Sequence, residues 1–227
     1  MNALLIYPEF PDTYWSFKHT LKFLGKRAAQ PPLGLMTVAA LLPKAWEKRL
    51  VDTNVERLRD RDLAWADVAL ISAMHIQHPS LAAIVERCRA HGLRTVVGGP
   101  IASSISAAEL KVDHVVIGEA ESLIAGLARE LEQGTASLVY KADQKPAMES
   151  SPLPDLSLIR MNRYSTMAVQ ASRQGVMRGA RCMAQPIQNQ LRLHYRSLAQ
   201  PGRRLGVDAA DEGRGIHFRL SGHRDPR

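Results

Sequence analysis

Short apolar runs alternate with stretches of helical periodicity over the first 140 residues. The apolar runs have the length of buried strands and cover residues 3–7, 49–52, 67–72, 94–97 and 114–117. Helical patterns over residues 33–42, 79–88, 103–110 and 121–133 separate them. Strands that alternate with helices of this length predict parallel β-α-β units. The pattern therefore predicts an α/β fold with a flavodoxin-like, doubly wound sheet of five parallel strands in the order 2-1-3-4-5. Such a sheet binds its ligand at the carboxyl ends of the strands.

The alternation ends near residue 140. Pro146, Pro152 and Pro154 interrupt any regular element, so we expect a linker over residues 141–160. Residues 161–172 resemble the start of a further domain, with a β element over residues 165–170. Residues 173–227 have no sustained period of 3.6 or 2.0, which predicts a poorly ordered tail after a domain of residues 1–140.

The charge divides at nearly the same place. Of a net charge of +8, residues 1–150 contribute nothing, because they carry 17 basic and 17 acidic residues. Residues 151–227 hold 13 arginines, no lysine and five acidic residues. A basic tail could bind nucleic acid, but its arginines are scattered and no nucleic-acid-binding motif accompanies them. Nucleic-acid binding is therefore the weakest functional hypothesis.

The composition indicates a cytoplasmic protein. No run approaches the roughly 18 to 20 apolar residues that a membrane span needs. The N-terminus lacks the pattern of a signal peptide. The two cysteines, Cys88 and Cys182, do not suggest a disulfide framework.

Three predicted strands end in residues suited to a ligand. Ser72-Ala73-Met74 follows the third strand, Gly98-Gly99-Pro100 the fourth and Gly118-Glu119 the fifth. Glycines permit a sharp turn and a close approach of the backbone to a bulky ligand. Each signal alone has a simpler explanation as a turn, a helix cap or a helix-dipole contact. Together, on adjacent strand ends, they indicate a cofactor crevice.

Other ligands fit the sequence less well. A dinucleotide site needs Gly-x-Gly-x-x-Gly after the first strand, and the chain has Pro8-Glu9-Phe10-Pro11-Asp12 there. A phosphate-binding P-loop is also absent from the sequence. His75 and His78 have no third metal ligand near them, so a metal site is disfavoured.

The ordered series of motifs resembles the N-terminal half of cobalamin-dependent radical SAM proteins, above all the branch with the hopanoid methylases. The resemblance covers roughly residues 3–172 and rests on residues 15–19, 31–35, 50–54, 64–67, 71–77, 98–100 and 118–121. It implies a cobalamin-binding domain followed by a radical SAM barrel. The cofactor-binding residues that it implies are Pro32, Gly34, Ser72, Ala73, Met74, Gln77, Gly98, Gly99, Pro100, Gly118 and Glu119.

Two departures from related proteins limit this prediction. The loop after the first strand contains His19 but not Asp-x-His-x-x-Gly, which implies cobalamin without a protein histidine on cobalt. Ser172-Arg173 is followed by Gln174 and, of three expected cluster cysteines, only Cys182 remains. Three thiolates are needed to leave one iron of a [4Fe–4S] cluster open for S-adenosylmethionine. We therefore expect no iron–sulfur cluster in this chain and assign no catalytic residue.

These observations lead to one hypothesis about the origin of the tail, a frameshift. They also lead to two hypotheses about function besides nucleic-acid binding. The changes in charge, lysine content and periodicity all begin near the missing cluster motif, as a frameshift that truncates the radical SAM domain would produce. The leading functional hypothesis is a cobalamin-binding domain of a methyltransferase-type protein that is not catalytic alone. The alternative is a stand-alone corrinoid carrier or sensor that acts through a separate catalytic partner.

Overall fold

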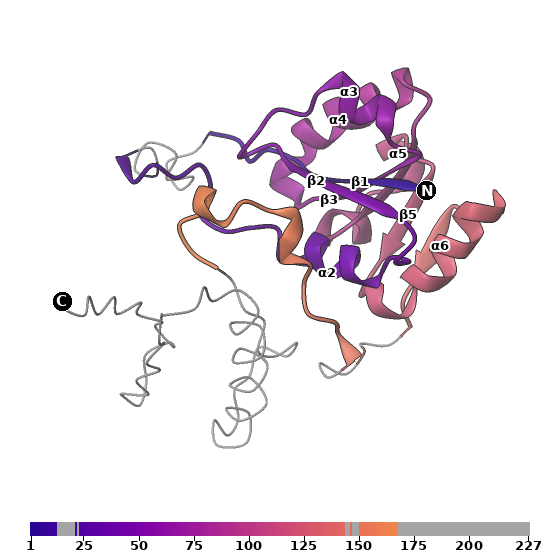
Figure 1. Cartoon of the computed structure of the whole chain (residues 1–227). Helices are drawn as coiled ribbons and strands as arrows, with labels where there is room; N and C mark the ends of the chain where they lie inside the picture. The colour runs from indigo at the N-terminus through magenta and orange to yellow at the C-terminus, as the bar shows by residue number, and fades with distance from the viewer. Residues whose placement is uncertain (13–20, 22, 144–145, 147–149, 168–227) are drawn as a thin grey trace. The chain divides into compact units, whose positions relative to one another are not determined.

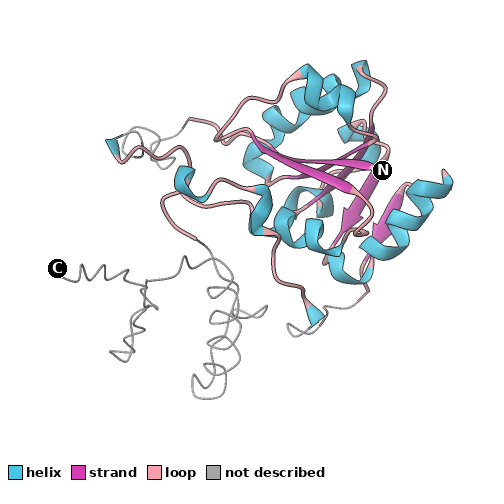
Figure 2. Ribbon diagram, in the orientation of Figure 1, coloured by secondary structure: helices cyan, strands magenta, loops and turns pink. Residues whose placement is uncertain are grey.

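Six parallel strands form the central sheet of the protein (Figures 1 and 2). The computed structural model describes residues 1–12, 21, 23–143, 146 and 150–167. The sheet order is β2-β1-β3-β4-β5-β6, and each neighbouring pair is parallel. The strands are β1 (Asn2–Tyr7), β2 (Glu47–Asp52), β3 (Val68–Ser72), β4 (Arg94–Gly98), β5 (His114–Ile117) and β6 (Val139–Lys141).

Helices cover both faces of the sheet (Figure 1). One face carries α2 (Leu33–Leu41) and α6 (Ile124–Gln133). The other carries α3 (Asp60–Trp65), α4 (His78–Ala90) and α5 (Ala107–Leu110). The short 3₁₀ turns are η2 (His75–Gln77), η3 (Pro100–Ser103), η4 (Ala120–Ser122), η6 (Leu156–Leu158) and η7 (Met161–Arg163).

The apolar composition of the strands follows from this layering. Residues 3–6 of β1 are completely buried, although they point alternately to opposite faces. Leu4 and Ile6 pack in the cluster under α3, α4 and α5, whereas Ala3 and Leu5 pack under α2 and α6. Because helices cover both faces of the strand, no side chain of residues 3–6 faces solvent. Apolar and polar residues therefore do not alternate, and the run is continuously apolar.

The predicted flavodoxin-like fold is confirmed, but the prediction of five strands is wrong. The sixth strand, β6, pairs with β5 through Val139, Tyr140 and Lys141. Helices α2 and α6 lie on the same face, yet they connect strands that advance in opposite directions across the sheet. The β5-α6-β6 crossover therefore has the opposite hand to β1-α2-β2. Nearly all parallel crossovers are right-handed, so this rule argues against a sixth strand in this position. A strand of three residues is also too short to be recognised from its sequence. For both reasons β6 could not be predicted.

Two further predictions for individual elements differ from the structure. The helix predicted over residues 103–110 is divided into η3 and α5, with Ser106 as the N-cap of α5. The β element predicted over residues 165–170 is absent from the part that is described, Ser165–Met167. Residues 168–170 and the predicted tail lie outside the described residues. The helices that the structure describes include none long and apolar enough to cross a membrane.

Candidate cobalamin site

The loops after β3 and β4 meet at the carboxyl end of the sheet. Ser72 and Gly98 are partners in the parallel register, so both strands end at the same level. Beyond them, the Ala73 amide donates a hydrogen bond to the Gly98 carbonyl (3.2 Å), and the Ala73 carbonyl accepts one from Ile101 N (3.2 Å). The ladder thus continues past the last strand residues and joins two predicted site loops, residues 72–74 and 98–100.

Gly99 makes this junction possible. Its φ of 85° lies in the left-handed region that favours glycine. A Cβ atom at Gly99 would lie 2.7 Å from Ser72 Oγ and 2.9 Å from the Ala73 carbonyl oxygen. The close approach that the sequence predicts at this glycine therefore exists, but the neighbouring loop of the protein itself fills the space.

The turn after β3 presents two apolar side chains to the surface. Met74 is 45% exposed and Ile76 is 51% exposed. The buried side chain of Gln77 holds this turn, because its Oε1 accepts a hydrogen bond from Met74 N (2.8 Å) and its Nε2 donates one to the Pro8 carbonyl (2.5 Å). Gln77 therefore fixes the turn to the loop after β1.

Polar contacts connect the same turn to the chain after β4. His75 Nε2 lies 3.0 Å from Ser104 Oγ, and both side chains are at the surface. Among the described residues, no group of three His, Cys, Asp or Glu side chains is arranged to hold a metal ion. The structure thus brings His75 to the carboxyl end of the sheet as a hydrogen-bonding group.

The remaining predicted site residues lie at the same end but apart from this junction. Gly118 has a φ of 91°, and its Cβ position is 3.1 Å from Ala142 Cβ, so the chain after β6 closes the Gly118-Glu119 loop. Pro32 is buried at the start of α2. Gly34 is exposed, and nothing lies within 4 Å of its Cβ position. The described structure therefore brings Ser72–Gln77 and Gly98–Pro100 together, whereas Pro32, Gly34 and Gly118 do not join them directly.

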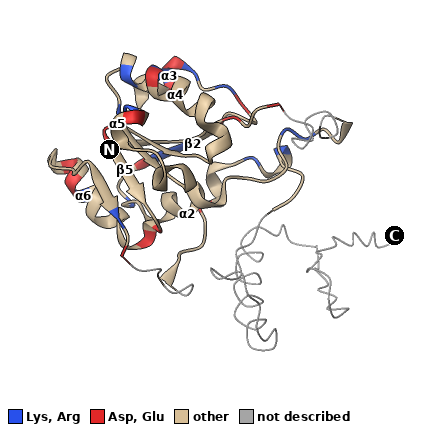
Figure 3. Cartoon of the chain, turned by 180° about the vertical axis from the view of Figure 1, so that it is seen from behind, with Lys and Arg blue, Asp and Glu red and all other residues tan. Residues whose placement is uncertain are grey.

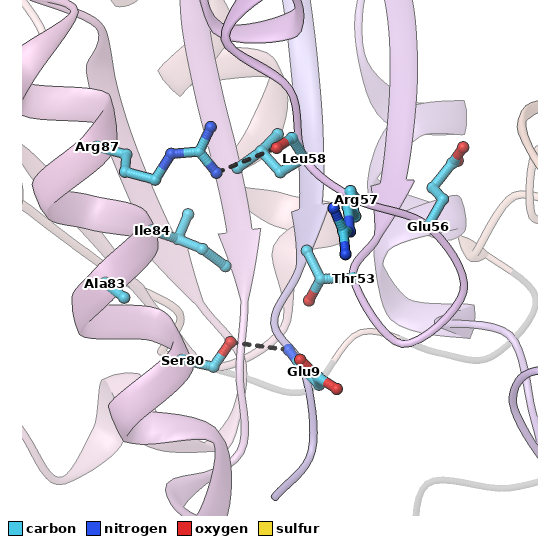
Figure 4. A pocket seen from close by; sticks show the side chains of 9 residues that line it. All are labelled: Glu9, Thr53, Glu56, Arg57, Leu58, Ser80, Ala83, Ile84 and Arg87. Carbon is cyan, nitrogen blue, oxygen red and sulfur yellow. Dashed lines mark hydrogen bonds between the residues drawn. The ribbon is translucent and has the colours of Figure 1, made fainter. Parts of the chain in front are cut away.

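Two cavities flank the carboxyl end, and none of the eleven predicted residues lines them. The first, of about 310 Å³, lies between the loop after β2 and α4 (Figure 4), and the second, of about 270 Å³, lies beside the turn after β3. The second is lined by Glu9, Phe10, Pro11, Asp12, Ile76, Pro79 and Ser80. Sequence reasoning missed these residues because the loop after β1 lacks any known phosphate or dinucleotide pattern.

A buried carboxylate lies at the end of β2, where sequence reasoning placed no site residue. Asp52 is 2% exposed, and its Oδ1 accepts hydrogen bonds from Asn54 N (2.9 Å) and Asn54 Nδ2 (2.7 Å). Burial raises the pKa of Asp52, although the bonds from Asn54 oppose this shift. Burial and the nearby Asp52 also raise the pKa of Tyr7. Acidic and basic residues are interspersed on the helices of this domain (Figure 3).

Comparison with known proteins identifies the domain. Residues 27–128 match the B12 binding domain family. The chain is 37% identical over 175 residues to an uncharacterized methyltransferase of Synechocystis sp., covering 76% of this chain and 33% of that protein. It is 29% identical over 176 residues to the hopanoid C-2 methylase of Rhodopseudomonas palustris, covering 75% and 33%. It is 27% identical over 139 residues to the bacteriochlorophyllide d C-12(1)-methyltransferase of Chlorobaculum tepidum, covering 61% and 30%.

Residues 27–128 thus match a B12-binding domain, and the chain is similar to methyltransferases. These findings confirm the predicted resemblance to the branch that includes hopanoid methylases. The chain spans about a third of the length of the curated relatives that it matches. No solved structure matches it.

Proposed function

We propose that this domain binds cobalamin at the carboxyl end of β1, β3 and β4, as the cofactor-binding part of a radical SAM methyltransferase-type system. The observation that carries the proposal is the junction of the loops after β3 and β4, found within a B12-binding domain. That junction presents Met74 and Ile76 beside the polar groups of His75 and Ser104. A corrin ring has apolar faces and a rim of amide groups, so it needs this combination of surfaces.

The chemistry of the described residues fits the cofactor. Met74 and Ile76 would contact the corrin face, and the backbone and hydroxyl groups of residues 98–104 would contact its rim. The cavity of about 270 Å³ beside Ile76 extends this surface toward Phe10. When bound, cobalamin supplies a carrier for one-carbon groups. We infer that cobalt has no protein histidine ligand, because the loop after β1 contains His19 but lacks the Asp-x-His-x-x-Gly pattern.

Chemistry beyond cofactor binding belongs to a separate catalytic partner in this proposal. The sequence has only two cysteines, and Cys88 is completely buried on α4. Burial raises the pKa of its thiol to about 11, which keeps it protonated near neutral pH. Three cluster thiolates are therefore not available from these residues, and Cys182 lies outside the described residues.

Titration with hydroxocobalamin tests the proposal. The purified chain should retain about one equivalent after desalting, measured from its visible absorbance. Met74→Glu should weaken binding at least about tenfold, because a carboxylate under a corrin face is desolvated without a partner. The matched control is Leu138→Glu, at an apolar position that is 56% exposed and precedes β6 at the amino end of the sheet. Failure of the unaltered chain to retain any cobalamin would overturn the proposal.

Electron paramagnetic resonance of the cobalamin-loaded chain tests whether a histidine ligates cobalt. Under the proposal, the electron paramagnetic resonance spectrum of the reduced, Co(II) form lacks superhyperfine splitting from a protein histidine nitrogen. Labelling the histidines with ¹⁵N should leave that spectrum unchanged. A change on labelling would show a histidine on cobalt, and His75→Ala would then identify whether it comes from this turn.

A further inference from the structure

Residues 150–166 pack against the B12-binding domain and do not form a linker that leaves it without contacts. We call these residues the strap. Leu156 is 7% exposed and lies in the core cluster with Leu5, Leu35 and Leu50. Backbone hydrogen bonds fix the strap on both sides of this residue. Asp155 N donates to the Met36 carbonyl (3.0 Å), and the Arg163 carbonyl accepts from Arg27 N (2.8 Å). The strap is therefore part of the folded domain, although its proline-rich sequence predicts a linker.

Tyr164 of the strap contacts the buried carboxylate at the end of β2. Its hydroxyl donates a hydrogen bond of 3.0 Å to Asp52 Oδ2, and the two residues are 112 positions apart in the chain. Tyr164 is 5% exposed and Asp52 is 2% exposed. Burial and the neighbouring Asp52 raise the pKa of Tyr164, so its hydroxyl remains a donor. Deleting this hydroxyl would leave one carboxylate oxygen of Asp52 without this buried donor.

The hydrogen bonds continue from Asp52 to the turn after β3. Asn54 Nδ2 donates a hydrogen bond to Asp52 Oδ1 and another to the Pro8 carbonyl (3.2 Å). The Pro8 carbonyl also accepts a hydrogen bond from Gln77 Nε2. Gln77 Oε1 in turn accepts from Met74 N. The resulting series, which we call the relay, consists of Tyr164, Asp52, Asn54, Pro8, Gln77 and Met74.

Hydrogen bonds join each member of the relay to the next, and the middle of the relay is largely removed from solvent. Gln77 is completely buried, and Asn54 is half-buried. Asn54 Oδ1 also accepts from Phe10 N (2.9 Å), which fixes the wall of the cavity beside Ile76. A shift of the strap therefore changes the support of both Met74 and Phe10, the groups that border the proposed corrin surface.

We propose that the relay couples the strap to the cobalamin site, with Tyr164 as a positioning residue. The docked strap favours the conformation of the loops after β1 and β3 that binds the corrin, and bound cobalamin favours the docked strap. This inference rests on the proposed function. Because coupling between two sites is reciprocal, the strap and the cofactor must affect each other by the same factor.

Removing one hydroxyl group tests the direction from strap to cofactor. Tyr164→Phe keeps the ring in place and should weaken hydroxocobalamin binding about three- to tenfold, the range expected for a buried hydrogen bond and for coupled sites. The control is Tyr140→Phe, which removes a hydroxyl bonded to Glu130 and Ser137 between α6 and β6, away from the relay. Its affinity for hydroxocobalamin should be unchanged.

Limited proteolysis tests the opposite direction. Arg160 and Arg163 lie in the strap and provide trypsin sites whose cleavage requires its local opening. Saturating hydroxocobalamin should slow cleavage at these sites about three- to tenfold in the unaltered chain. In Tyr164→Phe the protection should shrink by the same factor as the affinity. A purely structural tyrosine would instead speed cleavage equally with and without cofactor, and that result would overturn the inference.

A double variant tests whether the coupling passes through the relay. Gln77→Glu keeps the acceptor for Met74 N but loses the donor to Pro8. If the relay carries the effect, Tyr164→Phe should change the affinity of the Gln77→Glu chain by less than about twofold. Full additivity would contradict the relay. Absence of cobalamin binding by the unaltered chain would refute the proposed function, whereas normal binding by Tyr164→Phe would refute only this inference.

Discussion

The loops after β3 and β4 and the strap lie on the same domain, but different kinds of contacts hold them in place. The loops are fixed by the register of adjacent strands and by one glycine, Gly99, whose neighbours are Ser72 and Ala73. The strap is fixed by backbone hydrogen bonds to Met36 and Arg27, by one buried side chain, Leu156, and by one buried hydroxyl, that of Tyr164. The comparison shows that strand register shapes the loops at the carboxyl end of the sheet, whereas partners distant in the sequence hold the strap.

The strongest way to break the first region is to add a side chain at Gly99. Gly99→Val should lower the free energy of unfolding by about 3 kcal/mol or more, because its Cβ overlaps Ser72 and Ala73 and its φ is strained. Urea denaturation monitored by circular dichroism measures the effect. The control, Gly126→Ala, has open space at its Cβ and lies within α6, so it should stabilise by about 0.5 to 1 kcal/mol. Equal stability of the two variants would refute this account of Gly99.

Truncation of Leu156 is the corresponding test of the strap. Leu156→Ala should lower the free energy of unfolding by about 2 to 3 kcal/mol, because it leaves a cavity beside Leu5 and Leu35. Leu153→Ala, at a position that is 46% exposed in the same segment, should change it by less than about 0.5 kcal/mol. The same denaturation series compares both variants. A flexible linker would give two equally small effects.

Asp52 joins the two regions and should make stability depend on pH. Its pKa is raised in the folded protein, so the folded state binds more protons than the unfolded state between the two pKa values. Its contribution to stability is therefore greatest below the ordinary value of about 3.9 and falls as pH rises through the folded value. The free energy of unfolding, measured in urea at several pH values and compared with that of Asp52→Asn, should show this decline only in the unaltered chain. A constant difference would contradict it.

Features that arise from local periodicity could be predicted from the sequence. The first five strands, α2, α4 and α6 follow from apolar runs with glycine and proline at their ends. Gly98-Gly99 could be assigned to a sharp strand-end turn for the same reason. The junction of residues 72–74 with 98–100 followed from the general rule that parallel strands bring their carboxyl ends together.

Features that depend on distant partners could not be predicted. Asp52 ends a predicted strand and belongs to the motif of residues 50–54, but nothing in the sequence indicates Tyr164 as its partner. Leu156 follows three prolines, whose local effect predicts a linker, although its side chain is buried. The cavity residues Phe10 and Ile76 come from two loops without a recognisable motif. The functions of residues 72–77 and 98–100 in cofactor binding remain predictions.

The separation of 112 positions between Asp52 and Tyr164 also sets an order in time during protein synthesis. At about 5 to 20 residues per second, the ribosome needs roughly 6 to 22 s to pass from the carboxylate to its hydroxyl partner. The strands and the β3–β4 junction are complete before Tyr164 emerges, so the nascent domain first forms its cofactor surface with Asp52 lacking this donor. Under the proposed function, cobalamin that binds in this interval of seconds meets the domain before the strap supports the site.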